Sequence, residues 1–85
     1  MRLRDFGKCL TRLEHEKKDK NVRSITVYHK THAIICTDIS KAEVNGFSMN
    51  DIAALFFDDT IITMIKIEEL TNISFIDYQN NQIAS

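Results

Sequence analysis

The sequence of 85 residues has no proline and no tryptophan, and it holds only two glycines and two cysteines. With so little glycine and no proline, it contains no flexible linker and no collagen-like segment. Its apolar runs fall far short of the ~20 residues that a membrane-spanning helix needs. The first residues also lack the apolar segment of a secretory signal peptide. These absences predict one cytoplasmic domain over residues 1–85, without a membrane partner.

A charge excess of one sign is also lacking, because 11 basic residues nearly balance 12 acidic ones. The formal net charge of -1 argues against a protein that mainly wraps nucleic-acid phosphates, since that task requires clustered positive charge. The two cysteines, Cys9 and Cys36, do not have the CxxC spacing of a zinc or redox motif. We therefore expect two reduced, buried thiols, with no metal site and no cofactor. A disulfide between them is the less favoured alternative.

What the sequence does contain is regular apolar patterning, which begins with a helix. Four apolar residues recur at intervals of three and four positions, as they do on one face of an amphipathic helix: Leu3, Phe6, Leu10 and Leu13. We predict a helix over residues 4–19, with Gly7 tolerated inside it if the helix must approach a sheet closely. The mixed-sign run EHEKKDK, residues 14–20, is typical of a solvated helix end.

The rest of the chain alternates in the manner of β-strands. The clearest signal is TIITMIKI, in which β-branched residues dominate and apolar positions follow a period of two. Residues 68–70 then break the alternation as a short turn would, before a second apolar strand begins. We predict strands over residues 22–29, 33–44, 60–67 and 72–78, followed by a polar and frayed tail over residues 79–85.

Residues 47–57 admit two interpretations. As a helix over about residues 48–57, the segment would use Ser48 as its N-cap and would contain several good helix formers. As a strand, it would follow a tight turn at Asn45-Gly46, a pair that accepts the positive φ of hairpin turns. Replacing Gly46 by Val should then be strongly destabilising.

Cross-strand pairing favours the strand for residues 47–57. The turn at Asn45-Gly46 would set Ile39 opposite Ile52, and a second turn at Asp58-Asp59 would set Phe56 opposite Ile61. Apolar residues then face each other in both hairpins, as cross-strand stabilisation requires. We therefore predict a strand, with an α+β fold containing a second helix as the alternative.

Together these elements predict a mainly β domain, in which an N-terminal helix precedes a five-stranded antiparallel sheet. Both faces of that sheet would be apolar, so it should curl into a small barrel that buries one face, while the helix covers part of the other. The remaining apolar surface predicts a partner protein and self-association as a two-fold dimer. The residues predicted for this interface are Leu3, Phe6, Leu10, Leu13, Ile35, Ile39, Ile52, Phe56, Ile61 and Ile65.

The order of these elements resembles that of the Sm-like and SH3-like small barrels. The segment DDTIITMIKIEELTNISF, from Asp58 to Phe75, is similar to the YolD-like proteins of Gram-positive bacteria and, less closely, to the Rho-inhibiting protein Rof. The resemblance implies a small regulatory module that binds a protein in transcription or DNA-damage processes, and a phage-encoded inhibitor fits the same description. Two departures are Asp58-Asp59, where many such barrels have a glycine, and the absence of the RNA-binding signatures of true Sm proteins.

Two other functions stay open. An Sm-like RNA or DNA binder would use the basic residues of the N-terminal part, and we expect such binding to be weak, nonspecific and lost near physiological salt. A metal-dependent enzyme would use His29, His32 and an aspartate, but the spacing indicates no third or fourth ligand. No nucleophile elbow or Cys/His constellation is visible, so we expect no enzymatic activity. The basic residues are Arg2, Arg4, Lys8, Arg12, Lys17, Lys18, Lys20, Arg23 and Lys30.

Overall fold

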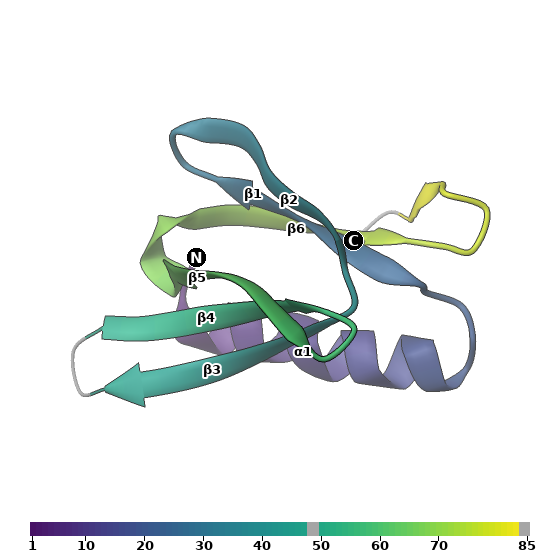
Figure 1. Ribbon diagram of the computed structural model, residues 1–85, viewed down its shortest axis with the longest axis horizontal. Helices are drawn as coiled ribbons and strands as arrows, with labels where there is room; N and C mark the ends of the chain where they lie inside the picture. The colour runs from purple at the N-terminus through teal and green to yellow at the C-terminus, as the bar shows by residue number, and fades with distance from the viewer. Residues whose placement is uncertain (48–49, 84–85) are drawn as a thin grey trace.

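The computed structural model describes residues 1–47 and 50–83, and it shows a mainly β domain with one N-terminal helix (Figure 1). Strands account for 53% of the chain, which confirms the predicted mainly β class with one N-terminal helix. The elements are α1 (Leu3–Lys18), β1 (Ser24–His29), β2 (His32–Ile39), β3 (Lys41–Phe47), β4 (Asn50–Phe57), β5 (Thr60–Lys66), the 3-10 turn η1 (Ile67–Glu69), β6 (Leu70–Ile76) and β7 (Gln82–Ile83).

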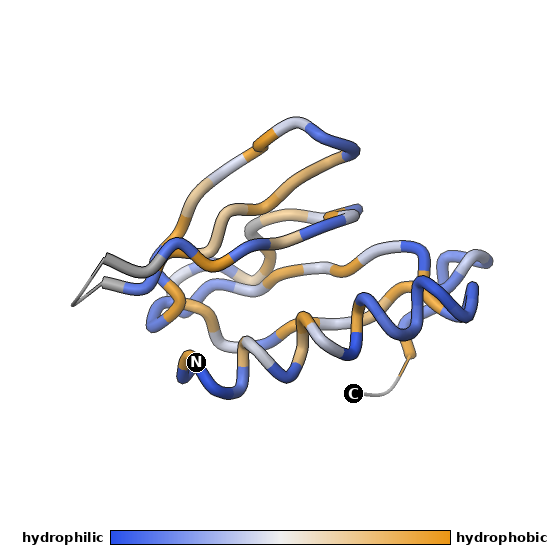
Figure 2. The backbone as a smooth tube through the Cα atoms, turned by 90° about the horizontal axis from the view of Figure 1, so that it is seen from below, coloured by the Kyte–Doolittle hydropathy of each residue, from blue (hydrophilic) through white to orange (hydrophobic). Residues whose placement is uncertain are grey.

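The strands form two antiparallel sheets that curl into a half-barrel. One sheet has four strands in the order β2-β1-β6-β7, and the other has three in the order β3-β4-β5. Helix α1 lies along the three-stranded sheet and continues toward the start of β1 (Figure 1). Its apolar positions recur between polar ones, and its C-terminal end is an uninterrupted polar stretch, as the hydropathy colours of Figure 2 show. The helix therefore buries one side and leaves the other to solvent.

The core fills the space between the two sheets and the helix. From α1 it takes Phe6 and Leu13, which are 0% and 3% exposed, while Leu3 stays exposed and Leu10 is half-buried. Gly7 is not needed for a close approach, because a Cβ atom built there meets nothing within 4 Å. The core residues contributed by the strands and η1 are Ile25, Val27, Ile39, Ala53, Leu55, Ile65, Ile67, Leu70, Ile73 and Phe75, with Val22 from the segment before β1.

The single strand predicted over residues 33–44 is wrong, because the chain changes sheets in the middle of it. Strand β2 pairs with β1, whereas β3 pairs with β4. Ser40 makes the corner between them. Its backbone N–H and its hydroxyl both donate to the carbonyl oxygen of Phe56, at 2.9 and 3.2 Å, and its hydroxyl accepts from the N–H of Asp58 at 2.9 Å. These bonds fix the point at which one sheet passes into the other.

The turn predicted at Asn45-Gly46 is also wrong. Both residues pair within the β3–β4 ladder, Asn45 with Ile52 and Gly46 with Asp51. Residues 48 and 49, between the two strands, lie outside the described residues. The strand itself is confirmed over Asn50–Phe57, so the alternative helix is excluded across that range. Phe47, expected as the first residue of this strand, is the last residue of β3.

The second hairpin follows the prediction at its turn and departs from it farther along. Phe56 pairs with Ile61 across the turn at Asp58-Asp59, as expected. Leu55, however, pairs with Thr63, so Ile62 is an extra residue in β5. This β-bulge shifts the register by one position, and a shift of one residue exchanges the two faces of a strand.

The tail is more ordered than the frayed segment expected over residues 79–85. Gln82 and Ile83 form β7, which pairs with the end of β6. The Asp77 carboxylate closes the connecting turn by accepting the backbone N–H groups of Gln79 and Asn81, at 2.8 and 2.9 Å. Residues 84 and 85 lie outside the described residues.

Candidate functional site

The most conspicuous surface is a group of large apolar side chains around β5, which we call the β5 strip: Phe57, Ile61, Ile62 and Met64. Their exposed fractions are 52%, 52%, 47% and 51%. In the same strand Ile65 is only 8% exposed and Thr63 is intermediate, so these two residues face inward. Large apolar side chains that gather on one exposed strand are typical of interaction surfaces rather than of scattered surface residues.

The β-bulge and the position of β5 together explain why the β5 strip is exposed. Ile61 and Ile62 are neighbours in the sequence, and an unbroken strand would turn one of them inward. The bulge at Ile62 allows both to face outward. Strand β5 is also an edge strand, since in the part of the chain that the structure describes no further strand follows it in the order β3-β4-β5.

Charged residues surround this apolar centre. Asp58, Asp59 and Lys66 are exposed at the two ends of β5. On the neighbouring side, the Lys41 ammonium lies 5.2 Å from the centroid of the Phe56 ring and forms a 2.9 Å ion pair with Glu43. An apolar centre with a polar and charged rim is the usual composition of a protein–protein interface.

The residues predicted for an interface divide between the surface and the core. Leu3 and Ile61 are exposed, Leu10 and Ile52 are half-buried, and Phe56 is 9% exposed. Ile35 lies in β2, but its side chain lies outside the described part of the structure. The folded chain itself covers four of the predicted residues, which belong to the core: Phe6, Leu13, Ile39 and Ile65.

Only some of the predicted basic residues share one surface. Arg4, Lys8 and Arg12 follow one another at intervals of four along α1 and line a shallow groove with Gly7, Thr11 and His15. The Arg12 guanidinium also lies 4.3 Å from the centroid of the Phe75 ring.

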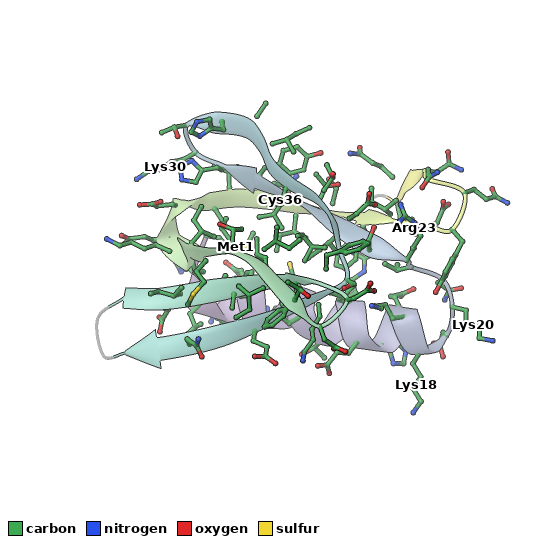
Figure 3. All side chains as sticks on the ribbon, in the orientation of Figure 1. Met1, Lys18, Lys20, Arg23, Lys30 and Cys36 are labelled. Atoms are coloured by element: carbon green, nitrogen blue, oxygen red, sulfur yellow. The ribbon has the colours of Figure 1, made fainter. Side chains whose placement is uncertain are left out.

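Others are placed elsewhere or engaged within the fold. Lys18 and Lys20 lie at one end of the molecule and Lys30 at the other (Figure 3). Arg23 forms a 2.7 Å ion pair with Asp38, and Lys17 donates to the carbonyl oxygen of Ser40 at 2.5 Å. The continuous basic surface is thus limited to the groove on α1.

The two histidines singled out from the sequence do lie side by side. His29 and His32 are paired across the β1–β2 hairpin, and their ring centroids are 5.3 Å apart. The third ionisable side chain at this site is Glu69, rather than the aspartate expected for a metal enzyme, and its Oε2 atom lies 3.0 Å from His29 Nε2. This hydrogen bond lowers the pKa of the Glu69 carboxyl, while partial burial opposes the shift. Across the described ranges, no three His, Cys, Asp or Glu side chains gather in a way that could hold a metal ion.

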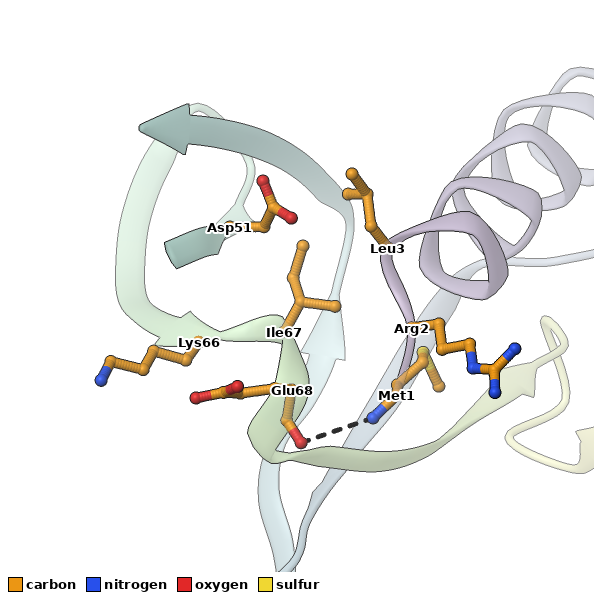
Figure 4. Close-up of a pocket in the computed structure, with 7 residues that line it drawn as sticks. All are labelled: Met1, Arg2, Leu3, Asp51, Lys66, Ile67 and Glu68. Atoms are coloured by element: carbon orange, nitrogen blue, oxygen red, sulfur yellow. Dashed lines mark hydrogen bonds between the residues drawn. The ribbon is translucent and has the colours of Figure 1, made fainter. Parts of the chain in front are cut away.

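A pocket beside the start of α1 combines charged and apolar groups (Figure 4). The amino group of Met1 donates to the carbonyl oxygen of Leu70 at 2.6 Å and reaches that of Glu68 at 3.5 Å. Asp51, Lys66 and Ile67 form the opposite wall. The ionisable side chains that line this pocket are Arg2, Asp51, Lys66 and Glu68.

Both cysteines are free thiols, and both are half-buried rather than fully buried. Within residues 1–47 and 50–83, no helix has the length and apolar character needed to cross a membrane. Comparison of the chain with protein-family models, curated proteins and solved structures yields no match.

Proposed function

We propose that this chain is a small non-enzymatic module that binds protein through the β5 strip and forms a two-fold dimer. The observation that carries the proposal is the exposure of four large apolar side chains on and beside one edge strand. Fully burying an exposed side chain of this size contributes about 1.5–3 kcal/mol, and each of these four is already about half covered. Covering the strip would therefore contribute about half of that value for each side chain and offset part of the cost of association. A two-fold dimer is the commonest closed arrangement of identical chains.

The proposal extends to the kind of barrel and its role. The order of α1, a bent run of antiparallel strands and a 3-10 turn before β6 supports an Sm-like or SH3-like arrangement. With the resemblance of Asp58 to Phe75 to YolD-like proteins and to Rof, we place the module in the cytoplasm of a bacterium or a phage-infected cell. Its partner would then belong to the transcription or DNA-damage machinery, either regulated by the module or inhibited by it.

Sedimentation velocity across a concentration series tests the dimer. The wild-type chain should associate as its concentration rises to about 100 μM, a range that detects micromolar affinities. Ile62→Lys should abolish association, because it places a charge in the centre of the β5 strip. Ile34→Lys is the matched control, since Ile34 is equally apolar and 52% exposed but lies on β2. If the wild-type chain stays monomeric at every concentration, the dimer is contradicted. The β5 strip would then bind only a different protein.

A second candidate is nucleic-acid binding through the groove on α1, favoured by the spacing of Arg4, Lys8 and Arg12. Fluorescence anisotropy with a labelled single-stranded RNA should show weak binding that fades by ~150 mM salt, because few phosphates would be contacted. Lys8→Glu should remove it, whereas Lys18→Glu, at the far end of the same helix, should have a smaller effect. Sub-micromolar binding at that salt concentration would reverse the ranking of the two functions.

A further inference from the structure

The tip of the β1–β2 hairpin brings two imidazole nitrogens together on the surface. The Nδ1 atoms of His29 and His32 are 3.5 Å apart, and the hydroxyl of Thr31 lies 2.8 Å from each of them. The His29 side chain is 10% exposed, whereas His32 and Thr31 are exposed. The pair is therefore held by the fold on one side and open to solvent on the other.

Hydrogen bonds fix the tautomer of His29. The backbone N–H of Thr31 donates to His29 Nδ1 at 3.1 Å, so Nδ1 must carry a lone pair. The proton of the neutral ring is then on Nε2, which donates to the Glu69 carboxylate at 3.0 Å. This is the form in which a histidine binds a metal through Nδ1, with a carboxylate holding the other ring nitrogen in place.

The distance between the two nitrogens fits one coordination geometry better than another. Two nitrogens bound to Zn²⁺ at 2.0–2.1 Å in a tetrahedral arrangement are about 3.3–3.4 Å apart. In a square-planar arrangement, as Cu²⁺ prefers, neighbouring nitrogens would be only about 2.9 Å apart. The observed 3.5 Å is close to the tetrahedral value.

We propose that the hairpin tip binds one tetrahedral divalent ion of the Zn²⁺ class through the Nδ1 atoms of His29 and His32. The ion replaces the Thr31 hydroxyl between these nitrogens and the Thr31 backbone N–H at His29 Nδ1. This requires the exposed Thr31 side chain to rotate about χ1 and the backbone of the exposed turn to move away from His29 Nδ1. Water fills the two remaining positions. Glu69 adds favourable charge, and Lys30 and Lys66, which lie near enough to lower its pKa, oppose the ion. With two protein ligands, the site should bind more weakly than structural zinc sites, which have four.

Titration of the full chain with Zn²⁺, after treatment with a chelator, tests this site. The ring resonances of His29 and His32 should shift together with one ion per chain, while those of His15 should not move. His32→Ala should lower the affinity by at least ~10–100-fold, the loss that weaker, indirect changes at metal sites already cause. Glu69→Gln should give a smaller loss of affinity, because the amide oxygen can still accept a hydrogen bond from His29 Nε2 but carries no charge.

His15→Ala is the matched control, since His15 is the remaining histidine and lies on α1 beside Asp19, 3.4 Å away. Binding that survives His32→Ala, or that is lost in His15→Ala, would overturn the proposal, as would the absence of any ring shift on adding Zn²⁺. Titration with Co²⁺ tests the geometry separately. An intense visible spectrum is expected for a tetrahedral ion, and the weak spectrum of an octahedral ion would overturn the tetrahedral assignment. His32 is exposed, so its replacement should leave the fold intact.

Discussion

Strands β5 and β6 are consecutive strands of similar length and apolar content, yet their side chains are buried to very different extents. Each has seven residues and is rich in large apolar side chains. In β6, Leu70, Ile73 and Phe75 are each 1% exposed, whereas in β5 Ile61 and Met64 are about half exposed. Strand β6 lies between β1 and β7, while β5 is the last strand of its sheet. Apolar patterning shows which residues can be buried, and position in the sheet decides which are.

The largest expected effect separates these two strands directly. Ile73→Ala should destabilise the protein by about 2–5 kcal/mol, because it opens a cavity in the core. Ile61→Ala should change the free energy of unfolding by only about 0.5 kcal/mol at low protein concentration, since the side chain is already largely in water. Urea denaturation of both variants measures the difference.

Protein concentration sharpens this test. If the β5 strip is covered in a dimer, the cost of Ile61→Ala should grow as the concentration rises, because association stabilises only the folded chain. The cost of Ile73→Ala should not change in this way beyond the wild-type trend. Equal costs for the two variants at low concentration would show that β5 is as well covered as β6. Should Ile73→Ala fail to fold, Ile73→Val should still cost about 0.5–1.5 kcal/mol.

A smaller effect compares the turn at Asp58-Asp59 with the strand position of Gly46. Asp58 has a φ of 53°, in the left-handed region that a β-branched residue resists. Asp58→Val should therefore cost about 1–2 kcal/mol. Gly46→Val should stay within about 0.5 kcal/mol of the wild type, because Gly46 belongs to a strand, where valine is favoured. The opposite ranking in thermal denaturation would restore the hairpin turn at Asn45-Gly46.

Much of the fold could be predicted from patterns in the local sequence. The apolar spacing on α1 predicted its bounds to within one residue at each end, and the turn at Asp58-Asp59 placed Phe56 opposite Ile61 correctly. The corner at Ser40 was missed because the segment from Ala33 to Val44 was predicted to be one strand. The alternation of Lys41, Ala42, Glu43 and Val44 marks a strand with one polar face, and it could have separated β3 from β2.

The candidate surface was less predictable than the fold. Ile61 was predicted at the interface, whereas Ile62 and Met64 of the same strand were not. The reason is the bulge at Ile62, which depends on pairing between strands and leaves no mark in the local sequence. The contact between His29 and Glu69 joins residues 40 positions apart, so spacing alone could not indicate it.

The smallest expected effect concerns the two thiols, whose reactivity reports how far helix α1 and the four-stranded sheet bury them. Cys9 lies on α1 and Cys36 on β2, and both pack against the core. Partial burial raises the pKa of each thiol above its ordinary value of 9.0; at Cys9, Arg12 opposes the shift and Asp5 adds to it. We therefore expect both thiols to react with iodoacetamide more slowly at neutral pH than a free cysteine does.

The pH dependence follows from the direction of these shifts. Because only the thiolate reacts, each rate should rise about tenfold per pH unit and continue to rise beyond pH 9.0, where a free thiol begins to level off. The unfolded chain loses its thiol protons first, so stability should fall slightly as the pH rises through 9.0. Cys36→Ser isolates Cys9 and Cys9→Ser isolates Cys36, with alkylation followed by mass spectrometry. A rate that levels off below pH 9.0 for either thiol would mean that its surroundings stabilise the thiolate. The partial burial of that cysteine would then not be the dominant influence on its pKa.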